Sequence, residues 1–265
     1  MDLGLNGHTA LVTGASKGIG LATATRLAQE GASVVLCARG ADDLARAVAQ
    51  IKATGGRALG VVCDVSDRSS PQKVLAQVAA AQFGPVDILV NNVGLATSAK
   101  LLTTTDEQWD AGLDLNFLST VRFTRQVLPQ MVEQRWGRII NVSSISAKLP
   151  SPNHLIYGAA KAAMIHFTKV VADSFAAEGV RCNCVLPGIT RTELVEANTL
   201  AAAVATGRTP EAVMARTLER SPIPAGRIGE PVEIADAICF LASANADWIT
   251  GVTLPIDGGA IPTVG

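Results

Sequence analysis

The chain has no excess of either charge, no long apolar run and only one tyrosine. Its 265 residues include 22 basic and 23 acidic ones, and the net charge of -1 disfavours the basic field that nucleic-acid binding needs. No apolar run reaches the roughly 18 to 20 residues of a membrane span, and the start lacks a signal-peptide core. We therefore expect a cytoplasmic protein that binds neither nucleic acid nor membrane.

Cysteine is also scarce, and the five residues present lie mostly in apolar runs, so we expect buried thiols. Cys182 and Cys184 form a C-x-C pair, but they lack the further ligands of a zinc site, and we expect no metal. No internal repeat or low-complexity linker is visible. The hydrophobic share of 48% fits a large core. A chain of 265 residues often folds as one domain, so we expect a single domain, 1–265.

Short runs rich in valine, isoleucine and leucine alternate about seven times with longer alanine-rich stretches. Such near-continuous apolar runs are typical of parallel strands that helices cover on both faces. The pattern predicts an α/β fold with a doubly wound sheet that binds ligands beyond the carboxyl ends of its strands. We expect strands at 9–14, 33–38, 58–64, 86–92, 137–144, 181–187 and 252–259, and helices at 18–30, 41–53, 71–82, 106–135, 156–178 and 231–243.

One segment, 190–226, breaks this alternation and reads as two short helices. Gly207 suits the C-terminal cap of the first, and Thr209 and Pro210 suit the start of the second. The insertion either lines a pocket as a lid or packs down on the core through its apolar residues, which are Leu194, Val195, Leu200, Val204, Val213, Met214 and Leu218.

The segment TGASKGIG places Gly14, Gly18 and Gly20 between a predicted strand and a predicted helix. Small residues there allow a tight turn and the close approach of a pyrophosphate to the helix N-terminus, which predicts dinucleotide binding. The second strand ends at Arg39 rather than at an acidic residue, and Lys17 in the glycine segment adds a second cation. We expect no carboxylate to compete for these two cations. This favours NADP(H) over NAD(H), because cations accommodate a 2′-phosphate.

Two further features concern the edge of this site and the chemistry. Asp64 closes the third strand and either recognises adenine or caps a helix, a role for which Ser66 is better placed. Tyr157 and Lys161 stand four residues apart and share a helix face, so the ammonium is expected to lower the phenol pKa. Ser144 precedes the tyrosine by thirteen residues.

Taken with Asn91-Asn92 and the segment PGITRT, these features resemble the short-chain dehydrogenase/reductase family nearly end to end. The family motif TGxxxGxG matches 13–20, and its catalytic tetrad falls on Asn116, Ser144, Tyr157 and Lys161. The resemblance implies a Rossmann-type fold and selects Ser144 over Ser143. It implies cofactor contacts from Gly14, Ser16, Lys17, Gly18, Ile19, Gly20, Arg39, Asp64, Val65, Asn91, Gly94, Tyr157, Lys161, Pro187, Gly188, Thr190 and Thr192.

Two positions depart from the family pattern: Val93 replaces an alanine, and Thr190 replaces a hydrophobic residue. Family geometry implies that Tyr157 passes a proton to a substrate oxygen held by Ser144, while Asn116 holds a water. It also implies a homotetramer. The expected substrate pocket is bounded mostly by apolar residues, namely Leu95, Ala96, Leu149, His154, Ile189, Leu194 and Val195.

The resemblance implies an NADP(H)-dependent oxidoreductase acting on a ketone or secondary alcohol, and the apolar pocket favours a hydrophobic or cyclic substrate. The alternatives are a 3-oxoacyl-thioester reductase, a non-catalytic NADP(H)-sensing or scaffold protein, and an epimerase or dehydratase. An acyl-carrier partner would need a basic patch, for which Arg122, Arg125, Arg135 and Arg138 are the candidates.

Overall fold

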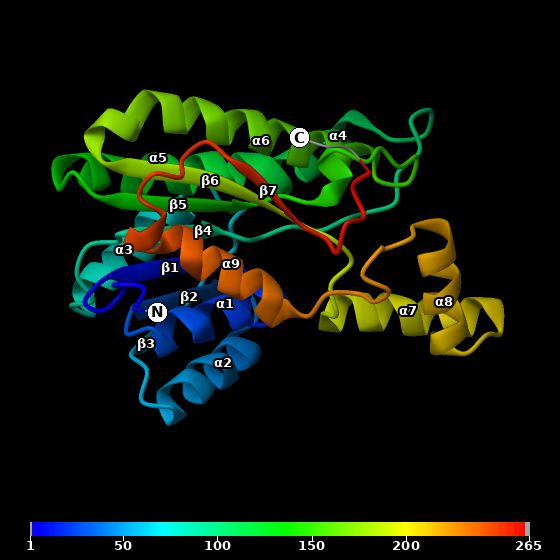
Figure 1. Cartoon of the computed structure of the whole chain (residues 1–265), viewed down its shortest axis with the longest axis horizontal. Coiled ribbons are helices and arrows are strands. Elements are labelled where there is room, and N and C mark those ends of the chain that lie inside the picture. The colour runs from blue at the N-terminus through cyan, green and yellow to red at the C-terminus, as the bar shows by residue number, and fades with distance from the viewer. Residues whose placement is uncertain (1, 263–265) are drawn as a thin grey trace.

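The computed structural model describes residues 2–262 and contains a parallel sheet of seven strands in the order β3-β2-β1-β4-β5-β6-β7 (Figure 1). This confirms the doubly wound fold expected from the sequence. The order reverses between β1 and β4, which is the switch point where such sheets bind ligands. The strands are β1 (Thr9–Thr13), β2 (Ser33–Ala38), β3 (Ala58–Val62), β4 (Ile88–Asn91), β5 (Gly137–Val142), β6 (Val180–Pro187) and β7 (Thr253–Ile256).

Helices cover both faces of the sheet, with α1, α2 and α9 on one side and α5 and α6 on the other (Figure 1). Successive residues of a strand point to opposite faces, so Ala10 and Val12 join one apolar cluster and Leu11 joins the other. The longer helices are α1 (Gly18–Gln29), α2 (Ala41–Ala53), α3 (Ser70–Ala80), α4 (Asp106–Leu113), α5 (Ser119–Glu133), α6 (Leu155–Phe175), α7 (Glu193–Thr206), α8 (Pro210–Arg220) and α9 (Pro231–Ala242).

The single helix expected over 106–135 is instead two helices joined by a π-helical segment, Asp114–Leu118. The wider turn leaves the Gly112 carbonyl facing Asn116, whose Nδ2 donates to it at 3.0 Å. A π-bulge of this kind needs a side chain to satisfy the displaced backbone, and apolar periodicity carries no sign of it. The expected family residue Asn116 therefore lies in an irregular turn rather than in regular helix.

The two helices expected in 190–226 are confirmed as α7 and α8. Gly207 ends α7 with φ of 63°, and the Thr209 hydroxyl accepts from the Ala212 N–H at the start of α8, where Pro210 is the first residue. The pair extends beyond the body of the molecule at the carboxyl ends of the strands (Figure 1). Leu200 and Val204 remain exposed, so these apolar residues do not pack onto the core.

No helix among residues 2–262 is long and apolar enough to cross a membrane. All five cysteines are free and buried, as expected from the apolar runs that contain them.

Gly112 lets α4 approach α6 just before the predicted catalytic tyrosine. A Cβ there would lie 2.4 Å from Ile156 Cγ2, and Ile156 is buried. We expect Gly112→Ala to lower stability by about 1–3 kcal/mol, despite the better helix propensity of alanine. Thermal unfolding measures the loss, and Gly112→Ala in an Ile156→Ala background should cost far less. An equal loss in both backgrounds would contradict this contact.

Candidate active site

The turn between β1 and α1 has the backbone of a phosphate-binding loop. Gly14 and Gly18 have φ of 65° and 54°, in the left-handed region that favours glycine. A Cβ on Gly20 would lie 2.3 Å from the Gly14 carbonyl oxygen, so only glycine fits this turn. Lys17 is the N-cap residue of α1 and its side chain caps no N–H group. The first N–H groups of α1 are thus open to an anion.

Lys17 and Arg39, the two cations expected to bind a 2′-phosphate, lie in the glycine loop and at the end of β2. Their surroundings differ from the sequence expectation in one respect. Lys17 Nζ lies 2.6 Å from Asp43 Oδ2 of α2, and this ammonium lowers the pKa of Asp43. A competing carboxylate is therefore present, contrary to the expectation. Arg39 is exposed and forms no ion pair or hydrogen bond with any residue in 2–262, so it is the cation available at this corner.

Asp64 and Val65 follow β3 at the far edge of the site. Asp64 Oδ1 accepts from the Ser66 N–H at 2.9 Å, and the Asp64 side chain is exposed. Ser66 does not cap α3; the N-cap residue is Ser69, which corrects the expected helix start. The Asp64 side chain shapes this turn and remains reachable from solvent.

The polar side chains at the end of β4 form hydrogen bonds within the protein. Asn91 Nδ2 donates to Asn141 Oδ1 at 2.9 Å and is buried. The next residue, Asn92, donates from Nδ2 to the carbonyl oxygens of Thr13 and Gly14 at 3.0 and 3.2 Å. Asn92 therefore ties β4 to the glycine loop, a role that sequence reasoning did not assign. The Asn91 amide is committed to the interior, which leaves its backbone for any ligand contact.

Lys161 is buried, and among residues 2–262 no carboxylate pairs with it. Its Nζ donates to the carbonyl oxygens of Val142 at 2.9 Å and Val93 at 3.3 Å, at the ends of β5 and β4. Burial lowers the pKa of this ammonium to about 8. A Cβ on Gly94 would lie only 3.0 Å from Nζ, so Gly94 leaves the space that the ammonium occupies.

Tyr157 lies on α6 one turn before Lys161, with Nζ 5.7 Å from the phenol ring centre. Burial raises the pKa of Tyr157, and a hydrogen bond with the Ser144 side chain partly opposes this rise. The expectation that Lys161 would lower the phenol pKa is not met, because the ammonium is directed to backbone carbonyls. The phenol is protonated at neutral pH.

The two neighbouring serines have different roles. Ser143 is buried, and its hydroxyl donates to the Lys161 carbonyl oxygen at 2.8 Å, so it fixes α6 against β5. Ser144 is half-buried, and its Oγ accepts from the Ser146 N–H at 3.1 Å while its side chain bonds Tyr157. The geometry thus favours Ser144, as family spacing implied.

The Asn116 side chain forms hydrogen bonds with the backbone of the loop after β4. The Leu95 N–H donates to Asn116 Oδ1 at 2.8 Å, and Asn116 Nδ2 donates to the Leu95 carbonyl at 3.2 Å. A Cβ on Gly94 would lie 3.5 Å from the same Oδ1, which places Asn116 and Lys161 around Gly94. The Asn116 side chain thus satisfies backbone groups, and the water that the resemblance implies for it stays a prediction.

The segment after β6, beginning at Pro187-Gly188, lies against the glycine loop. A Cβ on Gly18 would lie 3.1 Å from Thr192 Cγ2, and the Thr192 hydroxyl caps α7 by accepting from the Val195 N–H at 3.3 Å. The Thr190 hydroxyl is buried and donates to the Gly188 carbonyl at 3.1 Å. Thr192 therefore stands at the predicted cofactor site, whereas the Thr190 hydroxyl is used internally.

The residues expected around the substrate come from three loops at the carboxyl ends of the strands. The Ala99 and His154 backbones form an isolated parallel bridge, which joins the loop after β4 to the start of α6. Among the expected lining residues, Leu95, Ala96 and Leu194 are exposed, and Leu149, His154, Ile189 and Val195 are half-buried. Ser146, which contacts His154, was not foreseen because no periodicity or motif marks it.

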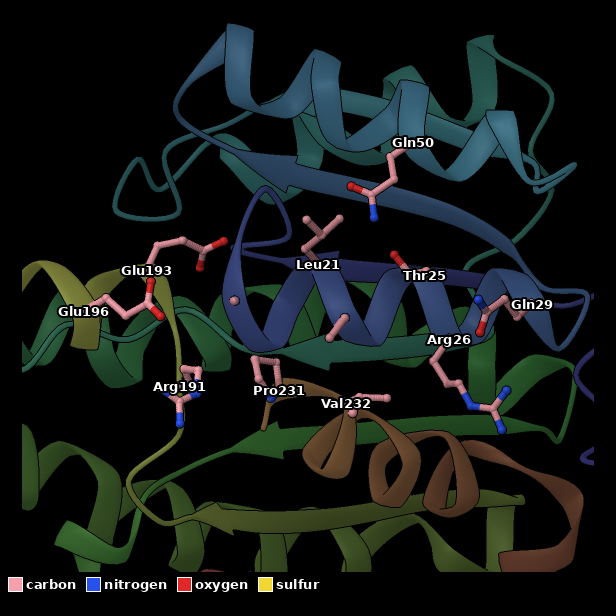
Figure 2. A pocket seen from close by; sticks show the side chains of 12 residues that line it. Leu21, Thr25, Arg26, Gln29, Gln50, Arg191, Glu193, Glu196, Pro231 and Val232 are labelled. Carbon is pink, nitrogen blue, oxygen red and sulfur yellow. The ribbon is translucent and has the colours of Figure 1, made fainter. Parts of the chain in front are cut away.

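A cavity of about 440 Å³ lies elsewhere, along the outer side of α1 (Figure 2). Leu21 and Thr25 of α1 line it, Gln50 reaches in from α2, and Pro231 and Val232 come from the start of α9. It includes Gly18 but none of the four tetrad residues. The chemistry expected from the sequence therefore does not take place in this cavity.

The four arginines proposed as a basic patch do not form one. Arg138 is buried and pairs with Asp247 at 3.0 Å, Arg135 lies 3.3 Å from Glu178, and Arg122 pairs with Asp114. Only Arg125 of the four is exposed without a partner in the described part of the chain. This corrects the sequence expectation, because paired arginines present little free positive charge.

Comparisons with known proteins agree with this fold. The short chain dehydrogenase family model matches residues 8–202. The 3-oxoacyl-[acyl-carrier-protein] reductase FabG of Thermotoga maritima is 36% identical, over 97% of this chain and 99% of the relative. Short-chain reductase protein NovJ of Streptomyces niveus is 40% identical, over 94% and 92%. The crystal structure of L-sorbose reductase from Gluconobacter frateurii with NADPH and L-sorbose has a TM-score of 0.95 at 33% identity, covering 100% of both chains.

The buried Lys161 ammonium predicts a stability that depends on pH. Its pKa is about 8 in the fold against 10.5 ordinarily, so the unfolded chain binds more protons between these values and stability rises with pH. From pH 7.5 to 9.5 we expect a gain of about 2 kcal/mol that Lys161→Met lacks. Urea unfolding of both proteins at each pH measures it. Parallel pH curves for the two proteins would contradict a lowered pKa.

Proposed function

The chain belongs to the short-chain dehydrogenase/reductase family, and we propose that it reduces a ketone to a secondary alcohol with NADPH, or runs the reverse reaction. The observation that carries the proposal is the placement of the Ser144 side chain beside the Tyr157 phenol, with Lys161 buried one helical turn further on. A sensing or scaffold protein would have no use for a half-buried, protonated phenol beside a serine hydroxyl.

The residues present suit a nicotinamide dinucleotide. Glycines 14, 18 and 20 leave room for a pyrophosphate at the start of α1, whose N–H groups have no side-chain cap. Gly94 and Thr192 would hold the nicotinamide half, and Asp64 and Val65 would border the adenine. The cofactor supplies the hydride for the substrate carbon.

The protein's own groups then handle the substrate oxygen. The Ser144 hydroxyl would donate a hydrogen bond to the carbonyl oxygen, and Tyr157, protonated at neutral pH because burial raises its pKa, would deliver the proton. The Lys161 ammonium donates to the Val93 and Val142 carbonyl oxygens, so it would hold α6, and with it Tyr157, against the ends of β4 and β5. Asn116 fixes the Leu95 backbone beside the reacting groups.

The preference for NADP(H) rests on Arg39. It is the free cation where β2 ends, and it would pair with a 2′-phosphate, whereas Lys17 must share its charge with Asp43. The L-sorbose reductase that resembles this chain was solved with NADPH. Both observations support a phosphorylated cofactor.

The substrate proposed is a largely apolar ketone, because several exposed leucines lie in and beside the loops around the site. Leu101 and Leu102 in the loop after β4 are 69% and 96% exposed, and Leu194 of α7 is also exposed. A 3-oxoacyl thioester is the second candidate, since the chain is similar to FabG over nearly its whole length. The paired state of Arg122, Arg135 and Arg138 argues against an acyl-carrier docking patch at those positions.

We further propose that residues 1–265 act as one catalytic domain in a cytoplasmic homotetramer. Exposed apolar residues on the outer strand and the helix beside it, Leu254 of β7 and Phe240 of α9, support burial against another copy.

Tyr157→Phe tests the proposed chemistry. The phenyl ring keeps the packing but has no proton to give, so we expect NADPH affinity within about twofold and at least about a 1,000-fold loss of kcat. Fluorescence titration and initial rates of NADPH oxidation with a ketone panel measure the two effects. Undiminished turnover would refute the proton-transfer role, and tight NADPH binding by the wild type without turnover would favour a sensing protein.

Arg39→Ala tests the cofactor preference. Loss of the guanidinium should lower kcat/KM for NADPH by about 10- to 100-fold and leave that for NADH nearly unchanged, because only NADPH carries the 2′-phosphate. Arg46→Ala, which removes another exposed cation near the same corner, is the matched control. If both cofactors lose equally, Arg39 does not read the 2′-phosphate.

A further inference from the structure

His154 and Ser146 form a polar pair beside the catalytic hydroxyls that the proposed chemistry does not use. Ser146 Oγ lies 3.3 Å from His154 Nδ1, and the Ser146 N–H donates to Ser144 Oγ at 3.1 Å. The ring centres of His154 and Tyr157 are 6.0 Å apart, with the rings nearly perpendicular. A histidine is thus fixed at the edge of the site by the segment that carries the catalytic serine.

The second nitrogen of His154 is left without a partner. Nδ1 is engaged by Ser146, and no residue in 2–262 bonds Nε2, while the ring is half-buried. His154 is the N-cap residue of α6, but its side chain makes no capping hydrogen bond. A helix cap therefore does not account for it. Nε2 therefore offers the substrate one hydrogen-bonding atom, which is a donor in the tautomer whose Nδ1 accepts from the Ser146 hydroxyl.

We infer that His154 is a specificity-determining residue that binds a second oxygen of the substrate, so that the preferred ketones carry a hydroxyl or carbonyl one or two carbons from the reacting carbonyl. This inference rests on the proposed function. Ser146 is the positioning residue, because it acts on the substrate only through the imidazole.

The geometry suits such a substrate. Oxygens on adjacent or next-nearest carbons lie roughly 3–5 Å apart, given carbon–carbon bonds of about 1.5 Å. The ring centres of Tyr157 and His154 are 6.0 Å apart. One substrate can therefore place its carbonyl oxygen at the Tyr157 hydroxyl and a second oxygen at the imidazole. The surrounding leucines would hold the apolar remainder, and a half-buried donor left unpaired disfavours a ketone without the second oxygen.

The test compares ketones that differ only by replacement of the second oxygen function. 1-Hydroxyhexan-2-one is paired with heptan-3-one, and ethyl 3-oxohexanoate with nonan-4-one. We expect the wild type to favour the oxygenated member in kcat/KM by at least about tenfold. In His154→Leu this ratio should fall to about 1, mainly through a higher KM for the oxygenated ketone. Ser146→Ala should lower the ratio, and Ser146→Thr, which keeps the hydroxyl, should restore it.

His166→Leu is the matched control, because His166 is exposed further along the same helix, and it should leave the ratio and the rates unchanged. A wild-type ratio near 1, or a high ratio that survives His154→Leu, would overturn the inference while leaving the reductase itself intact. Failure of the proposed function is distinguishable, since no ketone would then consume NADPH even with the wild type, and the inference would fall with it.

Discussion

A buried ammonium that the backbone carbonyls hold constrains the whole site. Lys161 is held by the carbonyl oxygens of Val93 and Val142, so it ties α6 to the ends of β4 and β5, of which β4 borders the switch point. An unpaired charge at this depth is tolerated only where the backbone supplies its hydrogen bonds. Gly94 must lack a side chain for the ammonium to fit.

The positions of the other proposed catalytic groups depend on Lys161. Tyr157 lies one turn away on the same helix, and Ser143 pins that helix through the Lys161 carbonyl, which brings the adjacent Ser144 to the phenol. Asn116 hydrogen-bonds the Gly112 carbonyl within the π-helical turn and also the Leu95 backbone. Structural and chemical roles therefore alternate between neighbouring residues, and a substitution at Ser143 would disturb the site without touching substrate.

Local patterns made much of this predictable. The strands follow from apolar runs, and the turn before α1 follows from its glycines. Local capping alone marks the end of α7 at Gly207 and the start of α8 at Thr209 and Pro210. The π-turn at Asn116, the Asp43 partner of Lys17 and the contact between Ser146 and His154 were not predictable, because each depends on which side chains folding brings together. The raised pKa of Tyr157 was missed for the same reason, since burial outweighs a nearby cation that faces the backbone.

Deuterium transfer tests the central claim most directly. The protein would be incubated with NADPH carrying deuterium at C4 of the nicotinamide, each C4 epimer in turn, and an oxygenated ketone, and the product analysed by mass spectrometry. If the Ser144–Tyr157–Lys161 arrangement performs carbonyl reduction, one epimer yields an alcohol with a single deuterium on the carbinol carbon. A protein that binds NADPH but gives no deuterated alcohol with either epimer would contradict it.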